Sequence, residues 1–288
     1  MCGRYALGLQ RTEIRALPGY PNLEIGEWVN EDDFVPHYNI APNSLAPVIR
    51  RCNASSPDLQ MQTMRWGIPY GKVHAKSQQA INARSESIME GAGMWNKYRS
   101  SNRCVVVSQG YYEWQTKGKA KLPHFTKYAD GKVMLMAGLY HVSDETIPNY
   151  VFAIITTSAS TSLSWLHDRQ PVILTSDADV TKWLDTSSNA WAAELGNLLR
   201  PAGGLICYQV PKEVGKVGAE SPTFIQPVAM RKDGIEAMFA KQSTKQGGNK
   251  EGIKRKRSPS PVISSVHSEP AGERDESHKT ECKKLKVE

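Results

Sequence analysis

The chain has 288 residues, of which 40% are hydrophobic, so it is long enough to bury the core of one large domain or two small ones. Its formal net charge is +7, yet residues 241–288 alone hold 12 Lys and Arg against 7 Asp and Glu. The first 240 residues are therefore close to neutral, which excludes nucleic-acid binding through bulk charge and leaves only local clusters of basic side chains. No apolar run approaches the roughly 18 residues of a membrane-spanning helix.

Hydrophobic patterning predicts short helices and strands without a regular alternation. A first helix is expected to begin at Thr12 and to end before Pro18, and residues 20–44 are expected to form a loop. Strands are predicted at residues 45–50, 59–66, 104–108, 111–115, 132–140, 150–157, 171–175 and 205–210, and helices at 82–89, 94–101, 177–184 and 188–199.

This order of elements predicts the α+β fold class, with mostly antiparallel sheet or an open barrel and short flanking helices. We expect one domain over residues 1–240, with its core ending near residue 228. Residues 241–288 contain no Trp, Tyr or Phe and cannot bury enough apolar surface to offset their ordering entropy. They are expected to form a disordered basic tail.

The five cysteines are scattered, at positions 2, 52, 104, 207 and 282. No pair has the close spacing of a zinc site, and an odd number argues against a disulfide framework. Because the chain also shows no signal peptide, we expect a reduced intracellular protein without a bound metal or cofactor.

Cys2 directly follows the initiator methionine, which is readily removed ahead of a small residue. The new chain start would carry an amine and a thiol on adjacent carbons. A terminal amine has a pKa of roughly 7.7–8, against roughly 10.4 for lysine, so part of it is neutral and nucleophilic at pH 7. It can form a Schiff base with an aldehyde, and the thiol can close onto the imine as a thiazolidine. The alternative is a frayed, inert terminus.

Glu113 lies among aromatic residues in the predicted strand Tyr111–Gln115. Alternation along a strand places Tyr112 and Trp114 on one face and Glu113 with Tyr111 on the other. Aromatic bulk would desolvate the carboxyl group and raise its pKa into the range useful for proton transfer. A surface carboxylate on an amphipathic strand is the alternative.

Asn82 and Arg84 lie at the predicted start of a helix, where Asn82 suits an N-cap. Arg84 is less natural there, since a cation opposes the helix dipole, and a phosphate or carboxylate partner would explain it.

His167 lies in a charged loop ahead of the strand that begins at Pro171, where sites are often built, although a solvated loop histidine is the alternative. Trp66 and Pro42 offer flat surfaces for stacking on bases, although Trp66 also suits a core.

Six separated blocks of the sequence resemble, in order, the signature blocks of the SRAP family, the SOS-response-associated peptidases, whose eukaryotic branch comprises the abasic site processing proteins. The blocks are Met-Cys-Gly-Arg-Tyr at residues 1–5, Tyr-Asn-Ile-Ala-Pro at 38–42, Arg-Trp-Gly at 65–67, Ile-Asn-Ala-Arg-Ser-Glu at 81–86, Gly-Tyr-Tyr-Glu-Trp at 110–114 and His-Asp-Arg-Gln-Pro-Val-Ile-Leu at 167–174. The resemblance covers residues 1 to about 228. Gln170 departs from it, since a methionine is expected there, which affects the expected local packing.

The resemblance implies a single α+β domain with a basic groove for single-stranded DNA, loss of Met1, and covalent capture of abasic sites by Cys2. It implies that Asn82 orients the Cys2 terminus, that Glu113 shuttles protons and that His167 assists opening of the sugar ring and later reversal. Glu113 and Cys2 also fit self-cleavage of the Met1–Cys2 bond. The expected enzyme is thus lyase-like, with a peptidase activity directed at itself.

The resemblance also implies DNA contacts. Arg84, Arg4 and Arg169 would hold phosphates, while Trp66 and Pro42 would stack beside the lesion. The expected partners are single-stranded DNA with abasic sites and proteins of the replication fork. The protein is expected to be a monomer and to have no membrane partner.

The tail carries Lys254-Arg255-Lys256-Arg257 ahead of two Ser-Pro pairs, which predicts a nuclear import signal beside phosphorylation sites. Two other functions stay open. One is an N-terminal-nucleophile amidohydrolase, because class II glutamine amidotransferases also begin Met-Cys-Gly. The other is a non-covalent reader of modified bases such as 5-hydroxymethylcytosine.

Overall fold

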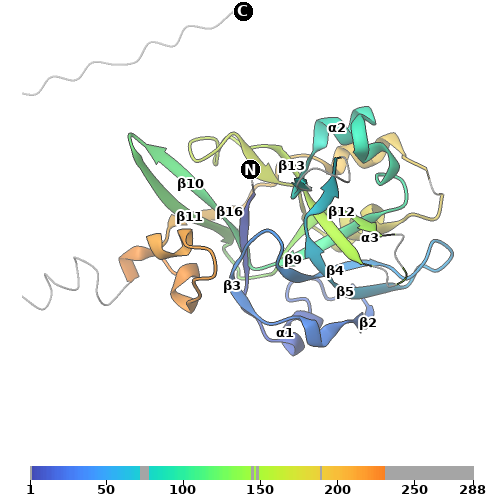
Figure 1. Cartoon of the computed structure of the whole chain (residues 1–288), viewed down its shortest axis with the longest axis horizontal. Coiled ribbons are helices and arrows are strands. Elements are labelled where there is room, and N and C mark those ends of the chain that lie inside the picture. Colours follow the sequence, from blue (N-terminus) through green and yellow to red (C-terminus); the bar gives the residue numbers. More distant parts are fainter. Residues whose placement is uncertain (1, 72–77, 144–145, 147–148, 189, 231–288) are drawn as a thin grey trace, which may run out of the picture. The chain divides into compact units, whose positions relative to one another are not determined.

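The computed structural model describes residues 2–71, 78–143, 146, 149–188 and 190–230. These form strands β1 (Arg4–Leu7), β2 (Ile25–Val29), β3 (His37–Ile40), β4 (Leu45–Arg51), β5 (Leu59–Trp66), β6 (Ile68–Tyr70), β7 (Gln78–Ala80), β8 (Asn82–Arg84), β9 (Arg103–Ser108), β10 (Gly110–Lys117), β11 (Ala120–Tyr128), β12 (Met134–Val142), β13 (Tyr150–Ser158), β14 (Arg169–Pro171), β15 (Ile173–Leu174) and β16 (Leu205–Gln209). The α-helices are α1 (Arg11–Arg15), α2 (Ser85–Glu90) and α3 (Asp177–Leu184). Figure 1 shows these elements coloured along the chain.

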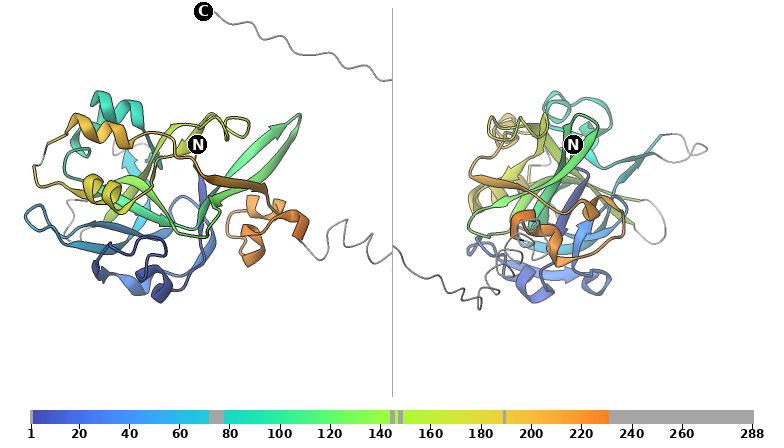
Figure 2. Two further views of the ribbon diagram at one scale, coloured as in Figure 1. Left: turned by 180° about the vertical axis from the view of Figure 1, so that it is seen from behind. Right: turned by 90° about the vertical axis from the view of Figure 1, so that its left-hand side faces the viewer.

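One sheet has five strands in the order β16-β11-β10-β1-β3, and all of its pairs are antiparallel. Strands β10 and β11 form a long hairpin that extends beyond the other strands, as Figures 1 and 2 show. Pairing with β10 places Arg4 opposite Tyr112. The antiparallel register therefore carries the start of the chain past Glu113.

The second sheet has nine strands and contains a closed ring. Its main path runs β14-β13-β12-β9-β4-β5-β2, and β13 also pairs with β5 through Val151 opposite Arg65 and Phe152 opposite Trp66. Strands β13, β12, β9, β4 and β5 thus close on one another. The predicted α+β class and the mostly antiparallel pairing are confirmed, and a short parallel contact closes the barrel.

Two apolar clusters hold the domain together. The main cluster fills the space between the two sheets and includes Trp66, Phe152 and Trp183. A smaller cluster, which contains Tyr112 and Phe125, lies between the β10–β11 hairpin and the short 3₁₀ turns after β16. Because alternate residues of β10 point to opposite faces, Tyr112 enters the small cluster while its neighbour Tyr111 enters the main one, as the alternation predicts.

The structure also corrects several predicted elements. Residues 20–44, predicted as loop, contain β2 and β3, and β11 was not predicted. The helix predicted from Asn82 begins instead at Ser85, because Asn82–Arg84 pair with β13 as strand β8. Arg84, in an extended conformation, occupies the N-cap position that was assigned to Asn82. The helices predicted at 94–101 and 188–199 are short 3₁₀ turns, Gly93–Lys97 and Ala193–Leu198.

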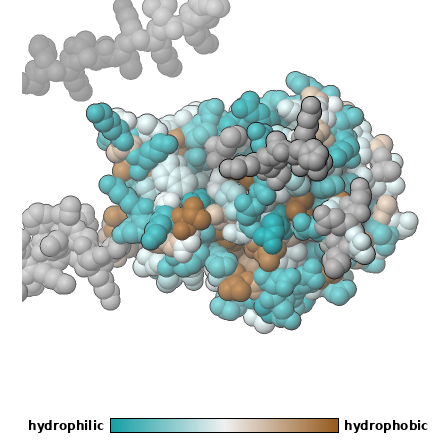
Figure 3. Space-filling view, viewed as in Figure 1, coloured by the Kyte–Doolittle hydropathy of each residue, from teal (hydrophilic) through white to brown (hydrophobic). Residues whose placement is uncertain are grey.

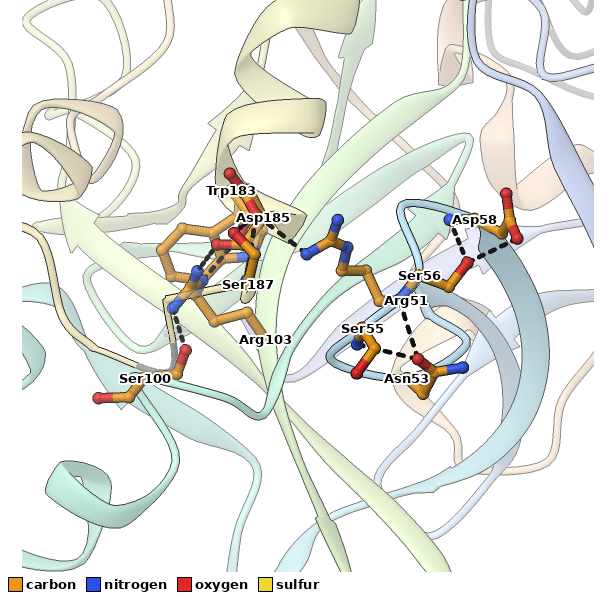
Figure 4. Close-up of polar contacts among 10 residues, drawn as sticks. All are labelled: Arg51, Asn53, Ser55, Ser56, Asp58, Ser100, Arg103, Trp183, Asp185 and Ser187. Carbon is orange, nitrogen blue, oxygen red and sulfur yellow. Dashed lines mark hydrogen bonds and ion pairs between the residues drawn. The ribbon is translucent and has the colours of Figure 1, made fainter.

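The end of α3 is fixed by a buried arginine. Arg103, 1% exposed, donates from Nε to the carbonyl oxygen of Trp183 at 2.6 Å. Its terminal nitrogens donate to the carbonyl oxygens of Arg99, Ser100 and Asp185. Figure 4 shows Arg103 with Ser100, Trp183 and Asp185, together with the nearby ion pair of Arg51 and the Asp185 carboxylate. These bonds tie β9 to the residues just before it and to the end of α3.

The predictions for the tail, including the nuclear import signal, concern residues 241–288 and lie outside the described residues. Within the described ranges, no helix has the length and apolar character needed to cross a bilayer.

Candidate active site

Three short strands bring the predicted site segments together. The end of β13 lies between β8 and β14, with Thr156 opposite Arg84 on one side and opposite Pro171 on the other. Asn82 begins β8, and His167 lies two residues before the start of β14. Backbone pairing therefore holds β8 and β14, which are more than 80 residues apart in sequence, on the two sides of β13.

Cys2 is buried, with 0% of its surface exposed, and Asn82 holds its backbone. The Asn82 Nδ2 group donates to the carbonyl oxygen of Cys2 at 2.8 Å. The Asn82 Oδ1 atom is buried and accepts no hydrogen bond from the residues that the structure describes. Burial raises the pKa of the Cys2 thiol, and the nearby Glu113 carboxylate raises it further. The thiol is therefore protonated at neutral pH, and its use as a nucleophile requires a base.

Glu113 combines burial with an ionisable group. Its side chain is only 9% exposed, and desolvation raises the pKa of its carboxyl group from 4.5 to about 7. A carboxyl group with this pKa exists in both protonation states at neutral pH, so it can accept and return a proton.

His167 lies next to Glu113, with its Nε2 atom 3.9 Å from Glu113 Oε1. The Arg169 backbone N–H lies 3.0 Å from Nδ1, and Nε2 is the ring nitrogen that faces Glu113. The Asp168 carboxylate lies 2.6 Å from Nδ1 and is mostly exposed. Burial is the largest cause that lowers the pKa of His167, so the neutral ring predominates at pH 7.

Cys2, Asn82, Glu113 and His167, the four predicted catalytic residues, therefore lie in one place. Asn82 links β8 to the start of the chain, β1 pairs with β10, and Glu113 on β10 meets His167 ahead of β14. The group combines a nucleophile, a side chain that orients it, and two groups able to exchange protons near pH 7.

Two of the predicted phosphate ligands have protein partners. Arg169 binds the Glu86 carboxylate with both terminal nitrogens, at 2.6 and 2.9 Å, and donates to the Thr156 carbonyl oxygen at 2.6 Å. The pKa of Glu86 is lowered to about 2, chiefly by these hydrogen bonds from Arg169. This ion pair fixes α2 against β14, so the side chain of Arg169 acts first as a structural tie.

Arg4 is engaged in a similar way. It donates to Asn39 Oδ1 at 2.6 Å and to the carbonyl oxygens of Val214 and Gly215 at 3.1 and 3.4 Å. Asn39 in turn donates to the carbonyl oxygens of Lys216 and Ala219. These contacts fasten the segment after β16 to β1 and β3.

Arg84 differs from both, because its side chain is exposed and forms no ion pair or hydrogen bond within the described ranges. It follows Asn82 by two residues on β8 and is therefore the predicted phosphate ligand whose guanidinium group is available to a ligand.

Trp66 does not fit its predicted stacking role. It is 0% exposed, its ring stacks on Phe152 and meets Tyr5 edge to face, and its Nε1 group donates to the Ile81 carbonyl oxygen at 2.9 Å. A base needs an exposed ring face, so in this structure Trp66 belongs to the core, the alternative that its residue type also favoured. Pro42 is partly exposed and lies beside the Trp66 segment, since Asn43 donates its backbone N–H to the Trp66 carbonyl oxygen.

Gln170, the departure from the family pattern, has a structural task that the sequence did not reveal. It is 1% exposed, and its Oε1 atom accepts from the Ser160 backbone N–H at 2.7 Å while its Nε2 group donates to the Ala202 carbonyl oxygen at 3.3 Å. It thereby anchors the loop that carries His167. No short-range sequence signal announces a contact of this kind, because it depends on how the loop folds back.

No three His, Cys, Asp or Glu side chains in the described part of the chain are grouped to hold a metal ion.

The fold and the site together define a class of α+β proteins in which a cysteine at the start of the chain lies buried beside an asparagine, a carboxyl group of raised pKa and a histidine. A model of the SOS response associated peptidase (SRAP) family matches residues 1–217. The chain belongs to this family.

Relatives and solved structures agree with the family assignment. The abasic site processing protein YMR114C of Saccharomyces cerevisiae is 30% identical over 294 residues, covering 88% of this chain and 77% of the yeast protein. The abasic site processing protein YoqW of Bacillus subtilis is 31% identical over 233 residues, covering 78% of this chain and 99% of its own. A crystal structure of a protein from Bacteroides thetaiotaomicron shares the fold with a TM-score of 0.63 at 24% identity, covering 78% of this chain and 99% of that one.

Proposed function

We propose that this protein processes abasic sites in single-stranded DNA by capturing the ring-opened sugar covalently on Cys2. The observation that carries the proposal is that Asn82 bonds to the Cys2 backbone, that Glu113 lies close enough to raise the pKa of the Cys2 thiol, and that His167 lies 3.9 Å from Glu113. The names of the yeast and Bacillus relatives, abasic site processing proteins, support the same substrate.

Removal of Met1 comes first. Hydrolysis of the Met1–Cys2 amide consumes one water and yields methionine and a free amine on Cys2. The protonated thiol of Cys2 needs a base to act as the nucleophile in this cleavage, and Glu113, whose pKa is about 7, is suited to accept its proton. The buried Asn82 Oδ1 atom is an acceptor suited to the new N–H groups of Cys2.

Capture then proceeds in balanced steps. The Cys2 amine adds to the sugar aldehyde, and loss of one water gives a Schiff base. The Cys2 thiol adds to the imine carbon while its proton passes to the imine nitrogen, which closes a thiazolidine. No oxidant or reductant is consumed. The raised pKa of the thiol favours the amine as the first nucleophile.

Glu113 and His167 supply the proton transfers. Loss of water from the carbinolamine needs a proton donor, and closure of the thiazolidine needs an acceptor for the thiol proton, both of which a carboxyl group with a pKa of about 7 provides. Opening of the sugar ring needs a proton on the ring oxygen, which the protonated form of His167 is suited to donate, becoming the neutral ring. Arg84, exposed beside Asn82, is the proposed phosphate ligand.

The test is incubation of the purified protein with single-stranded DNA that carries one abasic site, followed by denaturing electrophoresis. A denaturation-resistant adduct is expected, with mass spectrometry placing the sugar on Cys2 and showing loss of Met1. Cys2→Ala should give no stable adduct. A retained extra residue ahead of Cys2 should prevent capture while DNA affinity persists.

Two results would contradict the proposal. Equal adduct yield with and without the retained residue would exclude the terminal amine, and an adduct on another residue would exclude Cys2. Glutamine hydrolysis would instead indicate the amidohydrolase, and reversible retention of duplex containing 5-hydroxymethylcytosine, without an adduct, would indicate a reader of modified bases.

We also propose that the basic run Lys254–Arg257 directs the protein to the nucleus, where it would act in the response to DNA damage at replication forks. Replacement of the four basic residues by Ala should move a fluorescently tagged chain out of the nucleus without changing adduct formation in vitro.

A further inference from the structure

We propose that Trp165 is the stacking surface for a nucleobase beside the captured lesion. This inference rests on the proposed function, because it names how the same site holds single-stranded DNA. Trp165 lies in the loop between β13 and β14, and 49% of its surface is exposed, in contrast to the fully buried Trp66. An exposed indole offers a base the flat apolar face that stacking needs.

Its position in the sequence and one ring contact place Trp165 at the border of the site. Along the chain it precedes His167 by two residues. Across the sheet its ring meets His124 edge to face, with the ring centroids 5.2 Å apart. His124 lies directly opposite Glu113 in the pairing of β10 with β11. Trp165 is thus two residues from His167 along the chain and in contact with the residue that lies opposite Glu113.

The ring is held in place before any ligand arrives. Its Nε1 group donates to the Ser162 carbonyl oxygen at 2.9 Å. The loop is closed at its base by the Ala159 N–H, which donates to the Asp168 carbonyl oxygen at 2.8 Å, and by the buried Gln170 side chain, which accepts from the Ser160 N–H. A preorganised aromatic side chain binds with little loss of conformational entropy, so the exposed ring is suited to recognition.

The surface beyond Trp165 suits a nucleic-acid strand. Gln115 and Lys117 follow Glu113 at alternate positions of β10, so they share its face of the hairpin, and Lys117 is exposed. In Figure 3 the projecting end of the hairpin is hydrophilic. An aromatic ring followed by a polar and basic strand face favours a base and its phosphate backbone over an apolar peptide.

The test uses Cys2→Ala protein, in which capture is prevented, and single-stranded oligonucleotides with a tetrahydrofuran abasic analogue. The fluorescent base 2-aminopurine is placed at each neighbouring position in turn. Trp165→Ala should weaken binding by about 5- to 160-fold, which corresponds to the roughly 1–3 kcal/mol lost with one base-stacking contact. It should also abolish 2-aminopurine quenching at one position and leave quenching at the others.

Two further variants separate stacking from loop structure. Trp165→Phe keeps an aromatic face but loses the Nε1 hydrogen bond, and it should bind nearly as tightly as the parent. Trp165→Leu keeps apolar bulk without an aromatic face, and it should bind like Trp165→Ala. Val35→Ala, which truncates another exposed apolar side chain (56% exposed), is the control and should bind like the parent.

Parent-like affinity and quenching in Trp165→Ala, or equal binding by the Phe and Leu variants, would overturn the proposal. Adduct formation by the wild-type chain is measured in parallel. If the wild type forms the adduct and Trp165→Ala binds normally, only the stacking role fails. If the wild type forms none while Trp165→Ala still loses affinity and quenching, the capture mechanism fails and the stacking role stands.

Discussion

Glu113 and Arg103 are both buried charged residues, yet the protein uses them in opposite ways. Glu113, on β10, lies close to Cys2 at the start of the chain. Arg103, on β9, binds the backbone at the end of α3 (Figure 4). Desolvation is the main cause of the pKa shift in each. It raises the pKa of Glu113 from 4.5 to about 7 and lowers that of Arg103 from 12.5 to about 10.

The same physical cause therefore has two outcomes at neutral pH. Arg103 keeps its charge because its pKa remains well above 7, and four backbone carbonyl oxygens accept its hydrogen bonds. The pKa of Glu113 is raised to about 7, so both of its protonation states are populated at neutral pH. A buried charge thus becomes a candidate for catalysis when its shifted pKa lies near the working pH, whereas burial alone marks only a structural group.

The largest expected effect is the loss of proton transfer at Glu113. Glu113→Gln keeps the shape of the side chain but cannot exchange a proton, so adduct formation should slow by about 100- to 10,000-fold. Single-turnover capture of abasic single-stranded DNA, followed by denaturing electrophoresis, measures this rate. Glu194→Gln, at an exposed position, is the matched control. A normal rate in Glu113→Gln would remove Glu113 from the mechanism.

Arg103 should show the reverse behaviour. Arg103→Met leaves four carbonyl oxygens without their donor, and the free energy of unfolding should fall by about 3–5 kcal/mol. Arg103→Lys should recover only part of this, since one ammonium group cannot reproduce the planar set of donors. Urea unfolding measures the stability. Adduct formation well below the melting temperature should be unchanged, and a slowed rate there would couple this cluster to the site.

The pH dependence of stability should reveal Glu113 without any DNA. Between pH 4.5 and about 7 the folded protein holds the Glu113 proton more tightly than the unfolded chain, so this group loses its stabilising effect as the pH rises. The free energy of unfolding of the wild type minus that of Glu113→Gln is the quantity to compare at each pH. This difference should be lower by about 3 kcal/mol above pH 7 than below pH 4.5. Urea unfolding at several pH values measures this, and parallel curves for the two proteins would contradict the raised pKa.

Much of the fold could be predicted because local patterns agree with it. Strand β5 occupies the predicted residues 59–66, which begin with the alternation of apolar Leu59 and Met61 with polar Gln60 and Gln62. Strand β11 was missed because it contains Pro123 and two lysine residues, which disfavour a strand. It forms because β10 and β16 pair with it on both sides. Likewise, only pairing with the distant β13 makes Asn82–Arg84 a strand.

The site shows the same limit. Its four central residues could be named because their segments resemble a family, and the structure brings them together. The pairing of Arg169 with Glu86 across 83 positions could not be predicted, since nothing local to either residue indicates the other. The burial of Trp66 and the exposure of Trp165 are likewise decided by tertiary packing, which one sequence pattern does not encode.

The smallest effect is expected at the neighbouring ion pair of Arg51 and Asp185. Their charged atoms lie 3.0 Å apart, but the Asp185 side chain is 56% exposed, so water and salt screen the pair. Arg103 donates to the backbone carbonyl oxygen of Asp185, which the substitution Asp185→Asn leaves in place. Ser187 donates to the side-chain oxygen of Asp185, and the amide oxygen of Asn at this position can accept the same hydrogen bonds. A double-mutant cycle with Arg51→Met and Asp185→Asn should therefore give a coupling of at most about 1 kcal/mol in urea unfolding, and less at high salt. A coupling as large as the loss expected for Arg103→Met would mean that the pair of Arg51 and Asp185 is not screened by solvent as its exposure predicts.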